Sequence, residues 1–231
     1  MRTSLFGSFL AGFILCGLPA PTTASPLLNG DFSIPGSPPN PFFAWTTEPT
    51  IGDPPTDGGG FALFTESPTR AIQLQQTFDL PADAGTLSFD FRLTSSGTPV
   101  TTPPDSFQAT LYDTAFNPLF PYADPLFPGF FSIDNTGLVL ANPAVSITSL
   151  AGGYQRVTLD LAGLTLPQNG VTLEFLLNAS DDGVTTTVEL DNVTVTNRFA
   201  GVPEPASLLL VGLAGAAVLA ARGRARRAPA A

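Results

Sequence analysis

The stretch Leu87-Ser88-Phe89-Asp90-Phe91-Arg92-Leu93 decides the fold class of this chain. Its apolar residues recur at every second position, with polar or charged residues between them. Successive side chains of a β-strand point to opposite faces, so this period of two predicts a strand with one face on a core and the other in water. The same alternation returns at 157–161 and at 171–177. The chain is therefore predicted to be all-β.

Shorter apolar runs, separated by prolines and glycines, add further strands. These runs lie at 61–66, 71–80, 106–113, 137–141 and 185–196. Eight or nine short strands with turn signals between them predict an antiparallel β-sandwich or barrel. The pattern indicates a single domain, with two proline-rich loops at 34–55 and 116–130.

The last predicted strand changes phase within itself. Its apolar residues are in step up to Leu190 and again from Val193 onward, with one position too many between them. A β-bulge at Asp191-Asn192 would restore the burial of both halves, so a bulge is predicted there. The preceding Asp181-Asp182-Gly183 is interpreted as a hairpin turn rather than as a carboxylate site or a calcium loop.

The chain begins with a segment typical of a secretory signal peptide. Arg2 precedes an apolar run, 5–18, that is short for a bilayer span. Thr22-Thr23-Ala24 has small residues at the positions that signal peptidase reads, so residues 1–24 are predicted to be removed and Ser25 to become the new N-terminus. The alternative is an uncleaved N-terminal anchor.

Composition excludes several kinds of chemistry. The only cysteine, Cys16, lies within the predicted signal, so the mature chain is predicted to have no disulfide and no thiol chemistry. The chain also has no histidine and no lysine. Residues 25–201 hold 18 of the 19 carboxylates and four of the nine arginines, a net charge of −14. Such a surface repels nucleic acid and anionic membranes, so no nucleic-acid partner is predicted.

A non-catalytic protein is predicted on the same grounds. The residue types are missing for a Ser-His-Asp triad, a Cys–His pair, a Schiff-base lysine and a histidine-ligated zinc. Two alternatives remain open. One is a glycan-active enzyme that uses only a pair of carboxylates. The other is a passive surface protein without a specific ligand.

The C-terminal segment combines three features. The motif Val202-Pro203-Glu204-Pro205 comes first, and the apolar residues 206–221 are predicted to form a transmembrane helix. The prolines stop that helix from extending backwards into the folded domain. The helix is followed by four arginines, Arg222, Arg224, Arg226 and Arg227. They are expected to hold this end in the cytoplasm.

This tail resembles the PEP-CTERM sorting signal of Gram-negative bacteria over residues 202–227, with 228–231 as a short remainder. The resemblance implies processing near the motif by exosortase, a membrane protease-transpeptidase. It also implies export through the inner membrane, a transient membrane anchor, and delivery to the cell surface or the extracellular matrix. Proteins of this kind are associated with exopolysaccharide and biofilm. The implied partners are exosortase, signal peptidase and extracellular polysaccharide.

The two ends of the predicted sandwich resemble carbohydrate-binding jelly rolls of the galactose-binding-like type. The opening segment is Leu28-Asn29-Gly30-Asp31-Phe32-Ser33, followed by Trp45, and the closing strand is 188–195. The resemblance implies a jelly roll whose first and last strands adjoin. It also implies a structural calcium with Asp191 as a ligand, although the family's usual glutamate is replaced here by Ser33. Asp31 should face the other side of its strand, and no other cofactor is required.

Aromatic side chains are further candidates for ligand binding, because sugar rings stack on exposed aromatic faces. The ligand-binding aromatics are predicted to be Trp45, Phe120, Tyr122 and Phe127, within a wider set that adds Phe116, Phe130 and Phe131. The alternative, which the excess of phenylalanine favours, is that these rings plug the open ends of the sandwich. The domain is thus predicted to be a structural or carbohydrate-binding component of the extracellular matrix.

Overall fold

The computed structural model describes residues 26–48, 52–67, 71–97, 104–122, 128–178 and 183–198. The predicted signal peptide, and the sorting segment with its predicted helix, lie outside the described residues. Within the described ranges, no helix is long and apolar enough to cross a membrane.

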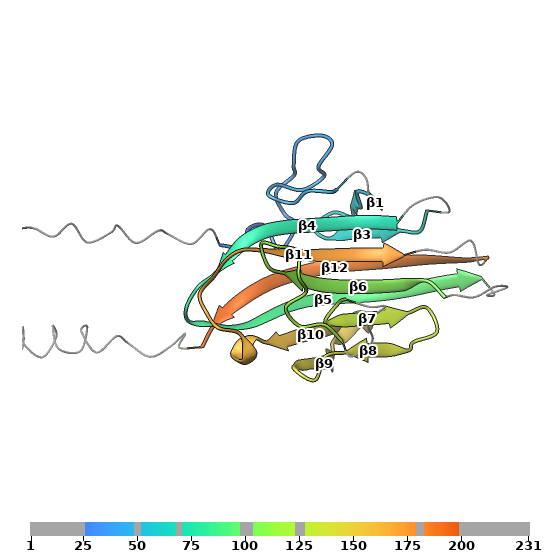
Figure 1. Ribbon diagram of the computed structural model, residues 1–231. Coiled ribbons are helices and arrows are strands. Elements are labelled where there is room, and N and C mark those ends of the chain that lie inside the picture. The colour runs from blue at the N-terminus through green and yellow to red at the C-terminus, as the bar shows by residue number, and fades with distance from the viewer. Residues whose placement is uncertain are drawn as a thin grey trace, which may run out of the picture.

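Strands dominate the described residues (Figure 1). They are β1 (Gly52–Asp53), β2 (Thr56–Asp57), β3 (Ala62–Thr65), β4 (Ala71–Leu80), β5 (Ala84–Gly97), β6 (Ser106–Tyr112), β7 (Phe131–Asp134), β8 (Val139–Ala141), β9 (Val145–Ser149), β10 (Gln155–Asp160), β11 (Gln168–Asn178) and β12 (Val184–Asn197). Two short 3-10 helices, η1 (Ala151–Gly153) and η2 (Leu161–Gly163), flank β10.

The strands form two six-stranded sheets that pack face to face. One sheet has the order β1-β4-β11-β6-β7-β8, and the other has the order β2-β3-β12-β5-β10-β9. Neighbouring strands are antiparallel except in the short β1–β4 pair. The chain changes sheets between β1 and β2, at each step from β3 to β6, between β8 and β9, and at each step from β10 to β12, as in a jelly roll. The predicted antiparallel β-sandwich is confirmed.

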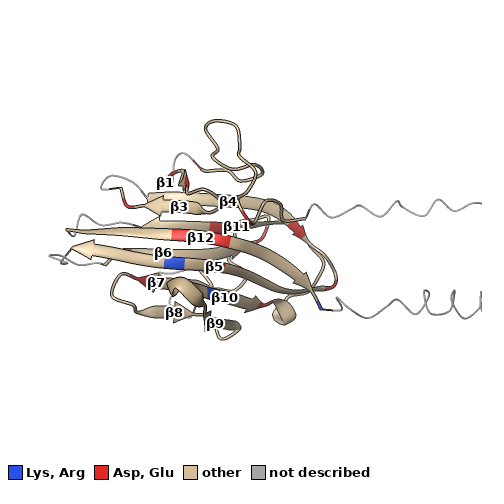
Figure 2. Cartoon of the chain, turned by 180° about the vertical axis from the view of Figure 1, so that it is seen from behind, with Lys and Arg blue, Asp and Glu red and all other residues tan. Residues whose placement is uncertain are grey.

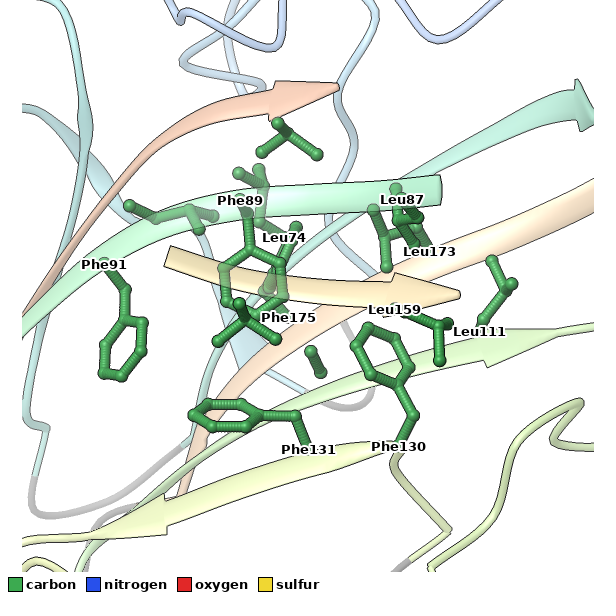
Figure 3. Packing of buried hydrophobic residues seen from close by; sticks show 14 of the residues in the cluster. Leu74, Leu87, Phe89, Phe91, Leu111, Phe130, Phe131, Leu159, Leu173 and Phe175 are labelled. Carbon is green, nitrogen blue, oxygen red and sulfur yellow. The ribbon is translucent and has the colours of Figure 1, made fainter. Parts of the chain in front are cut away.

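The core lies between the two sheets and is lined by the apolar half of the deciding stretch. Phe89 and Phe91 of β5 are fully buried, and Leu173 and Phe175 of β11 face them from the other sheet (Figure 3). The rings of Phe89 and Phe175 meet edge to face, with centroids 5.0 Å apart. Each large apolar side chain buried in this way contributes about 1.5–3 kcal/mol. The described residues contain no cysteine, so this apolar core stabilises the fold without any disulfide bond.

The predicted bulge in the last strand is confirmed. The register of β12 against β5 shifts between Asp191 and Thr194, and Asn192 adopts a φ of +53°. Because of this shift, Leu190 and Val193 both point into the core. Asparagine tolerates the left-handed region better than most residues, which explains its position at the bulge.

Four observed strands, β1, β2, β7 and β9, were not predicted. β1 and β2 have two residues each, too few to show any period. β7 begins at Phe131, directly after the predicted loop 116–130, and its side chains are mostly buried on both faces. β9 carries the sequence VSITS, whose alternation includes only two apolar residues, Val145 and Ile147, and is too short to stand out.

Candidate functional site

The outer face of the β12–β5–β10 part of the second sheet carries the charged half of the deciding stretch. Phe89 and Phe91 of β5 point into the core, so Asp90 and Arg92 point outward. Figure 2 shows acidic and basic residues side by side on β12, β5 and β10. Two rows of paired side chains cross the three strands here.

The first row joins Arg92, Glu189 and Tyr154. Arg92 lies directly opposite Glu189 and donates a hydrogen bond from Nη2 to the Glu189 carboxylate. The hydroxyl of Tyr154 donates to the other oxygen of that carboxylate. The guanidinium carbon of Arg92 lies 4.9 Å from the centroid of the Tyr154 ring, a cation–π contact. Nε of Arg92 is buried and has no hydrogen-bond partner among the described residues.

The second row joins Asp90, Arg156, Asn192 and Asp191. Asp90 is only 4% exposed and accepts hydrogen bonds from Nε and Nη2 of Arg156 at 2.7 and 2.8 Å. Asp191 lies directly opposite Asp90, and like charges so placed repel each other. The side-chain amide of Asn192 donates to Asp90 at 3.1 Å and to Asp191 at 3.2 Å. The bulge therefore brings an amide to the two carboxylates.

We call the residues of these two rows the polar stripe. Its members are Tyr154, Arg92, Glu189, Arg156, Asp90, Asn192 and Asp191.

Protonation within the polar stripe departs from ordinary values. Burial raises the pKa of Asp191, and the charges of Asp90 and Asp31 raise it further. Burial and the hydrogen bond to Glu189 raise the pKa of Tyr154 to about 12, so its hydroxyl remains a donor at neutral pH. Burial acts to raise the pKa of Glu189, but the hydrogen bonds from Arg92 and Tyr154 outweigh it and lower that pKa. Shifted pKa values concentrated on one surface are a marker of functional sites.

Hydroxyl groups continue the polar stripe along the same face. The hydroxyls of Thr86 on β5 and Thr196 on β12 are hydrogen-bonded at 2.6 Å. Both residues line a hollow of about 650 Å³, together with Asp160 and Arg198. The face thus offers hydroxyl, carboxylate and guanidinium groups within one continuous surface.

The arginines that the structure describes all lie on this face, among carboxylates. Arg92 and Arg156 belong to the polar stripe, and Arg198 lines the adjoining hollow. These three are the arginines of the described residues, and the fourth arginine of residues 25–201, Arg70, lies outside them. The three arginines that the structure describes in this acidic domain therefore all lie on the same side.

The opening segment and the closing strand meet, as the galactose-binding-like resemblance implies. The backbone N–H of Val193 donates to the carbonyl oxygen of Gly30 at 2.8 Å. A Cβ atom at Gly30 would lie 1.8 Å from the carbonyl oxygen of Val193, so only glycine fits there. The side chain of Asn29 holds the adjoining loop through hydrogen bonds to the backbone of Ile34 and Phe43. Asp31 is exposed and accepts a hydrogen bond from the hydroxyl of Ser33 at 3.0 Å.

Several of the predicted ligand-binding aromatics are core residues instead. Trp45 is 1% exposed, and its indole N–H donates to the carbonyl oxygen of Asn29 at 3.0 Å. Phe120, Phe130 and Phe131 are buried as well. Their ring faces are covered by protein, so the prediction that Trp45 and Phe120 bind a ligand is wrong. The alternative interpretation, that aromatic rings fill the sandwich, is the correct one for these residues.

The remaining aromatics lie in different settings. Tyr122 is half-buried, and Phe127 lies outside the described residues. Phe116 is 69% exposed, and its ring centroid lies 6.1 Å from that of Tyr112 at the end of β6. Phe116 is thus an open ring beside the other sheet, away from the polar stripe.

A calcium ion finds few ligands near Asp191. No three acidic, cysteine or histidine side chains of the described residues come together in a way that could hold a metal ion. The neighbouring Asp90 is engaged by Arg156. Calcium prefers six to eight oxygen ligands. The carboxylates of the described residues do not supply such a set around Asp191, and calcium binding by Asp191 stays a prediction.

Other predicted sites lie outside the described residues. They are the sorting motif Val202-Pro203-Glu204-Pro205, the four arginines from Arg222 to Arg227, and Asp181-Asp182 of the predicted hairpin turn.

Sequence reasoning singled out Asp191 and missed the rest of the polar stripe. The sequence did indicate that Asp90 and Arg92 lie on the outer face, because they occupy the outward positions of the stretch 87–93. Their partners Arg156 and Glu189 come from distant strands. Only the pairing of β10 and β12 with β5 identifies them.

Replacing Asp191 by asparagine is expected to stabilise the domain at neutral pH. The raised pKa means that the folded state disfavours the charged form, so the charge destabilises the fold above the folded-state pKa of Asp191. Relief of one repulsive pair across two strands, worth about 0.2–1 kcal/mol, should raise the melting temperature by about 1–4 °C. The gain should disappear as the pH falls below the ordinary aspartate value of 3.8, where both states are protonated. Thermal melting of native and Asp191→Asn proteins across pH measures this.

The same melting series tests the calcium prediction. A rise in melting temperature with calcium over chelator, lost in Asp191→Asn, would establish Asp191 as a ligand. An equal rise in both proteins would indicate diffuse binding to the acidic surface. A destabilising effect of Asp191→Asn at neutral pH would contradict the repulsion between Asp90 and Asp191.

Comparison with known proteins identifies the C-terminal segment. Residues 201–227 match the family model described as the PEP-CTERM protein-sorting motif. The chain therefore carries the signal of a surface protein that exosortase sorts, as predicted for residues 202–227. No curated protein matches the chain. One similar solved structure is described as a carbohydrate-binding module, CBM28, specific for non-crystalline cellulose. It shares 12% sequence identity with this chain, and the TM-score is 0.36. The match covers 67% of this chain and 88% of that chain.

Proposed function

We propose that the sandwich domain binds extracellular polysaccharide along the polar stripe, at the surface to which the sorting motif directs the chain. The observation that carries this proposal is the gathering of the described arginines, with paired carboxylates and a tyrosine, on one face of an acidic sandwich. Arg92, Glu189 and Tyr154 are joined by hydrogen bonds and stacking, so their positions are set before a ligand arrives. Such preorganisation lowers the entropic cost of binding.

The groups of the polar stripe suit the chemistry of sugars. Each sugar hydroxyl both donates and accepts hydrogen bonds, and the stripe alternates guanidinium donors with carboxylate acceptors. Glu189 already accepts two hydrogen bonds, but a carboxylate has about four lone-pair sites. Asp90 is buried and positions Arg156 instead. Asp191 supports a binding role in another way. Its charge is disfavoured by the fold, and residues that lower stability are found where function needs them.

A protein partner suits this face less well. Protein interfaces depend on a few buried aromatic or aliphatic anchors at their centre. The exposed large apolar side chains of the described residues lie elsewhere: Leu28, Ile34, Phe43, Phe116, Leu138, Val139 and Ile147. The polar stripe offers hydrogen-bonding groups without such an anchor, which favours a polar ligand.

We also propose that the polar stripe binds without cleaving. Glycoside hydrolysis needs one carboxylic acid that is protonated and one carboxylate that is free to act as a base or nucleophile. Glu189 is held by Arg92 and Tyr154, and the oxygens of Asp191 accept hydrogen bonds from Asn192. The release of reducing ends from the host's exopolysaccharide measures cleavage directly. Hydrolysis that is lost in both Glu189→Gln and Asp191→Asn would establish the carboxylate-dependent enzyme instead.

Replacing Tyr154 by alanine is expected to weaken polysaccharide binding about tenfold. The change removes an aromatic ring worth about 0.5–1.5 kcal/mol beyond its buried area, and it releases Arg92 from its stacked position. Co-sedimentation or affinity electrophoresis with the host's exopolysaccharide measures this, and circular dichroism checks that the variant is folded.

Phe116→Ala is the matched control, because it removes an exposed ring on the other side of the domain. Binding should be unchanged in this variant. If Phe116→Ala loses binding and Tyr154→Ala keeps it, the ligand lies on the other sheet. If the native protein and both variants all fail to bind the polysaccharide, the binding proposal is wrong. The domain is then interpreted as a passive surface protein without a specific ligand.

A further inference from the structure

The two sheets end in four edge strands, and two of these edges are protected. β1 and β2 have two residues each and carry Asp53 and Asp57. Pro54 and Pro55 connect them. Short length, charge and proline are the features that prevent one sheet edge from pairing with another. This side of the domain is therefore closed to further strands.

On the opposite side, β8 is also short, with three residues, and Pro143 lies in its connection to β9. β9 has five residues and carries neither charge nor proline, so it has no such protection. No charged residue occurs between Asp134 and Arg156, a segment that contains both strands. Large apolar side chains are exposed there: Leu138 is 58% exposed, and Val139 and Ile147 are each 38% exposed. Only residues 142–144 connect β8 to β9, so the open edges of the two sheets lie on the same side of the sandwich (Figure 1).

The hydrogen-bonding pattern shows which backbone groups of β9 face outward. Leu150 donates to Tyr154 at 2.8 Å, and Asp160 donates to Ala144 at 2.9 Å, at the two ends of the β9–β10 pairing. In an antiparallel pair, hydrogen-bonded positions alternate along the strand. Between those ends, Ser146 and Thr148 therefore bond to β10. The N–H and C=O groups of Ile147 point away from the sheet.

We propose that two copies of this chain pair through their β9 strands in antiparallel fashion about a two-fold axis at Ile147. Such a pairing is self-complementary: Ile147 lies opposite its own copy, and Val145 lies opposite Ser149. The N–H of Val145 already donates to the carbonyl oxygen of Asn142, so the new backbone hydrogen bonds would centre on Ile147. It extends the β2-β3-β12-β5-β10-β9 sheet directly into that of the second copy. Charge also limits where two copies of this domain can meet. Two domains of net charge −14 repel each other over most of their surface, and this uncharged edge is where they can approach.

Ile147→Lys tests the proposal on the full chain in detergent. Two lysines would then face each other across the axis, and like charges directly opposite each other are unfavourable. Sedimentation equilibrium should show a dimer for the native chain and a monomer for Ile147→Lys at the same concentration. Thr56→Lys, which places a lysine on the opposite edge, should remain a dimer. A monomeric native chain, or a dimer that Ile147→Lys leaves intact, would overturn the proposal.

A cross-link provides a second test that does not depend on disrupting the edge. In a Cys16→Ser background the chain has no other cysteine, so Ile147→Cys introduces a single thiol. Cα atoms directly opposite each other in a hydrogen-bonded antiparallel pair are about 5.5 Å apart, within the range for a disulfide. Oxidation should give a disulfide-linked dimer with Ile147→Cys and none with Thr56→Cys. Equal cross-linking at both positions, or none at Ile147→Cys, would contradict the pairing. Neither test involves polysaccharide, so the pairing and the proposed binding can fail independently.

Discussion

Leu173→Asp is expected to unfold the sandwich. Leu173 is fully buried at the centre of β11, between Gln76 of β4 and Leu111 of β6, and it faces the core. An aspartate there would place a charge among apolar side chains without a partner. Together with the lost packing this costs several kcal/mol, about as much as the whole stability of a typical domain, roughly 5–15 kcal/mol. Circular dichroism of a segment spanning residues 25–201 should show loss of the strand spectrum.

Thr185→Asp is the matched control for this prediction. Thr185 is exposed on β12, opposite Ser96, so a carboxylate there remains in water. Its effect should stay within about 0.5 kcal/mol, the usual range for surface changes. A cooperative melting transition of Leu173→Asp close to that of the native segment would contradict the core described here. A strong helical spectrum of the native segment would contradict the sandwich itself.

Much of the fold could be predicted because period-two burial is a local property. The predicted strand 71–80 has the same bounds as β4, and the deciding stretch lies within β5. The bulge at Asp191-Asn192 was also predictable, since a change of phase in one strand reveals it without any knowledge of its neighbours. β7 and β9 were missed because each is short, with four and five residues, and offers only two apolar positions in alternation. β7 is buried on both faces, and β9 is open on one edge.

The candidate site was less predictable, because it depends on partners that are remote in sequence. The contact between Asp90 and Arg156 spans 66 positions, and that between Arg92 and Glu189 spans 97. Strand order and register decide both, and residue types alone specify neither. Aromatic residues were misleading for a related reason. Trp45 in a proline-rich loop could as well stack on a sugar as fill the core, and its contacts with Asn29 and Phe32 settle the matter.

Pairing of two copies through β9 would strengthen polysaccharide binding by the polar stripe. Pairing through β9 would place two polar stripes on one continuous sheet, because β10 carries Arg156 and lies next to β9. A ligand with many repeating units would then meet two sites at once. Linked sites raise the overall affinity by about 10²–10⁴ without any new contact. Weak binding at each stripe would suffice for firm attachment to a polymer.

Replacing Pro203, Glu204 and Pro205 by alanine is expected to abolish maturation of the C-terminus. We expect the native chain to yield a surface form that begins at Ser25 and ends near residues 203–205, because the PEP-CTERM motif implies processing by exosortase. Without the motif, the apolar residues 206–221 and the arginines beyond them would remain attached. The chain should then stay in the membrane fraction with its basic end in the cytoplasm. Intact-mass analysis of the surface and membrane fractions distinguishes the two forms.

A charge-preserving variant separates recognition of the motif from orientation in the membrane. Replacing the four arginines by lysines keeps the positive charge that holds this end in the cytoplasm, so processing should continue. Replacing them by alanines removes that charge, and the segment should lose its fixed orientation and its processing. Arg222, Arg224, Arg226 and Arg227 stand directly after the apolar stretch, where the positive-inside effect is strongest. A mature surface form that retains residues 222–227 would contradict sorting by this signal, whatever the sandwich domain binds.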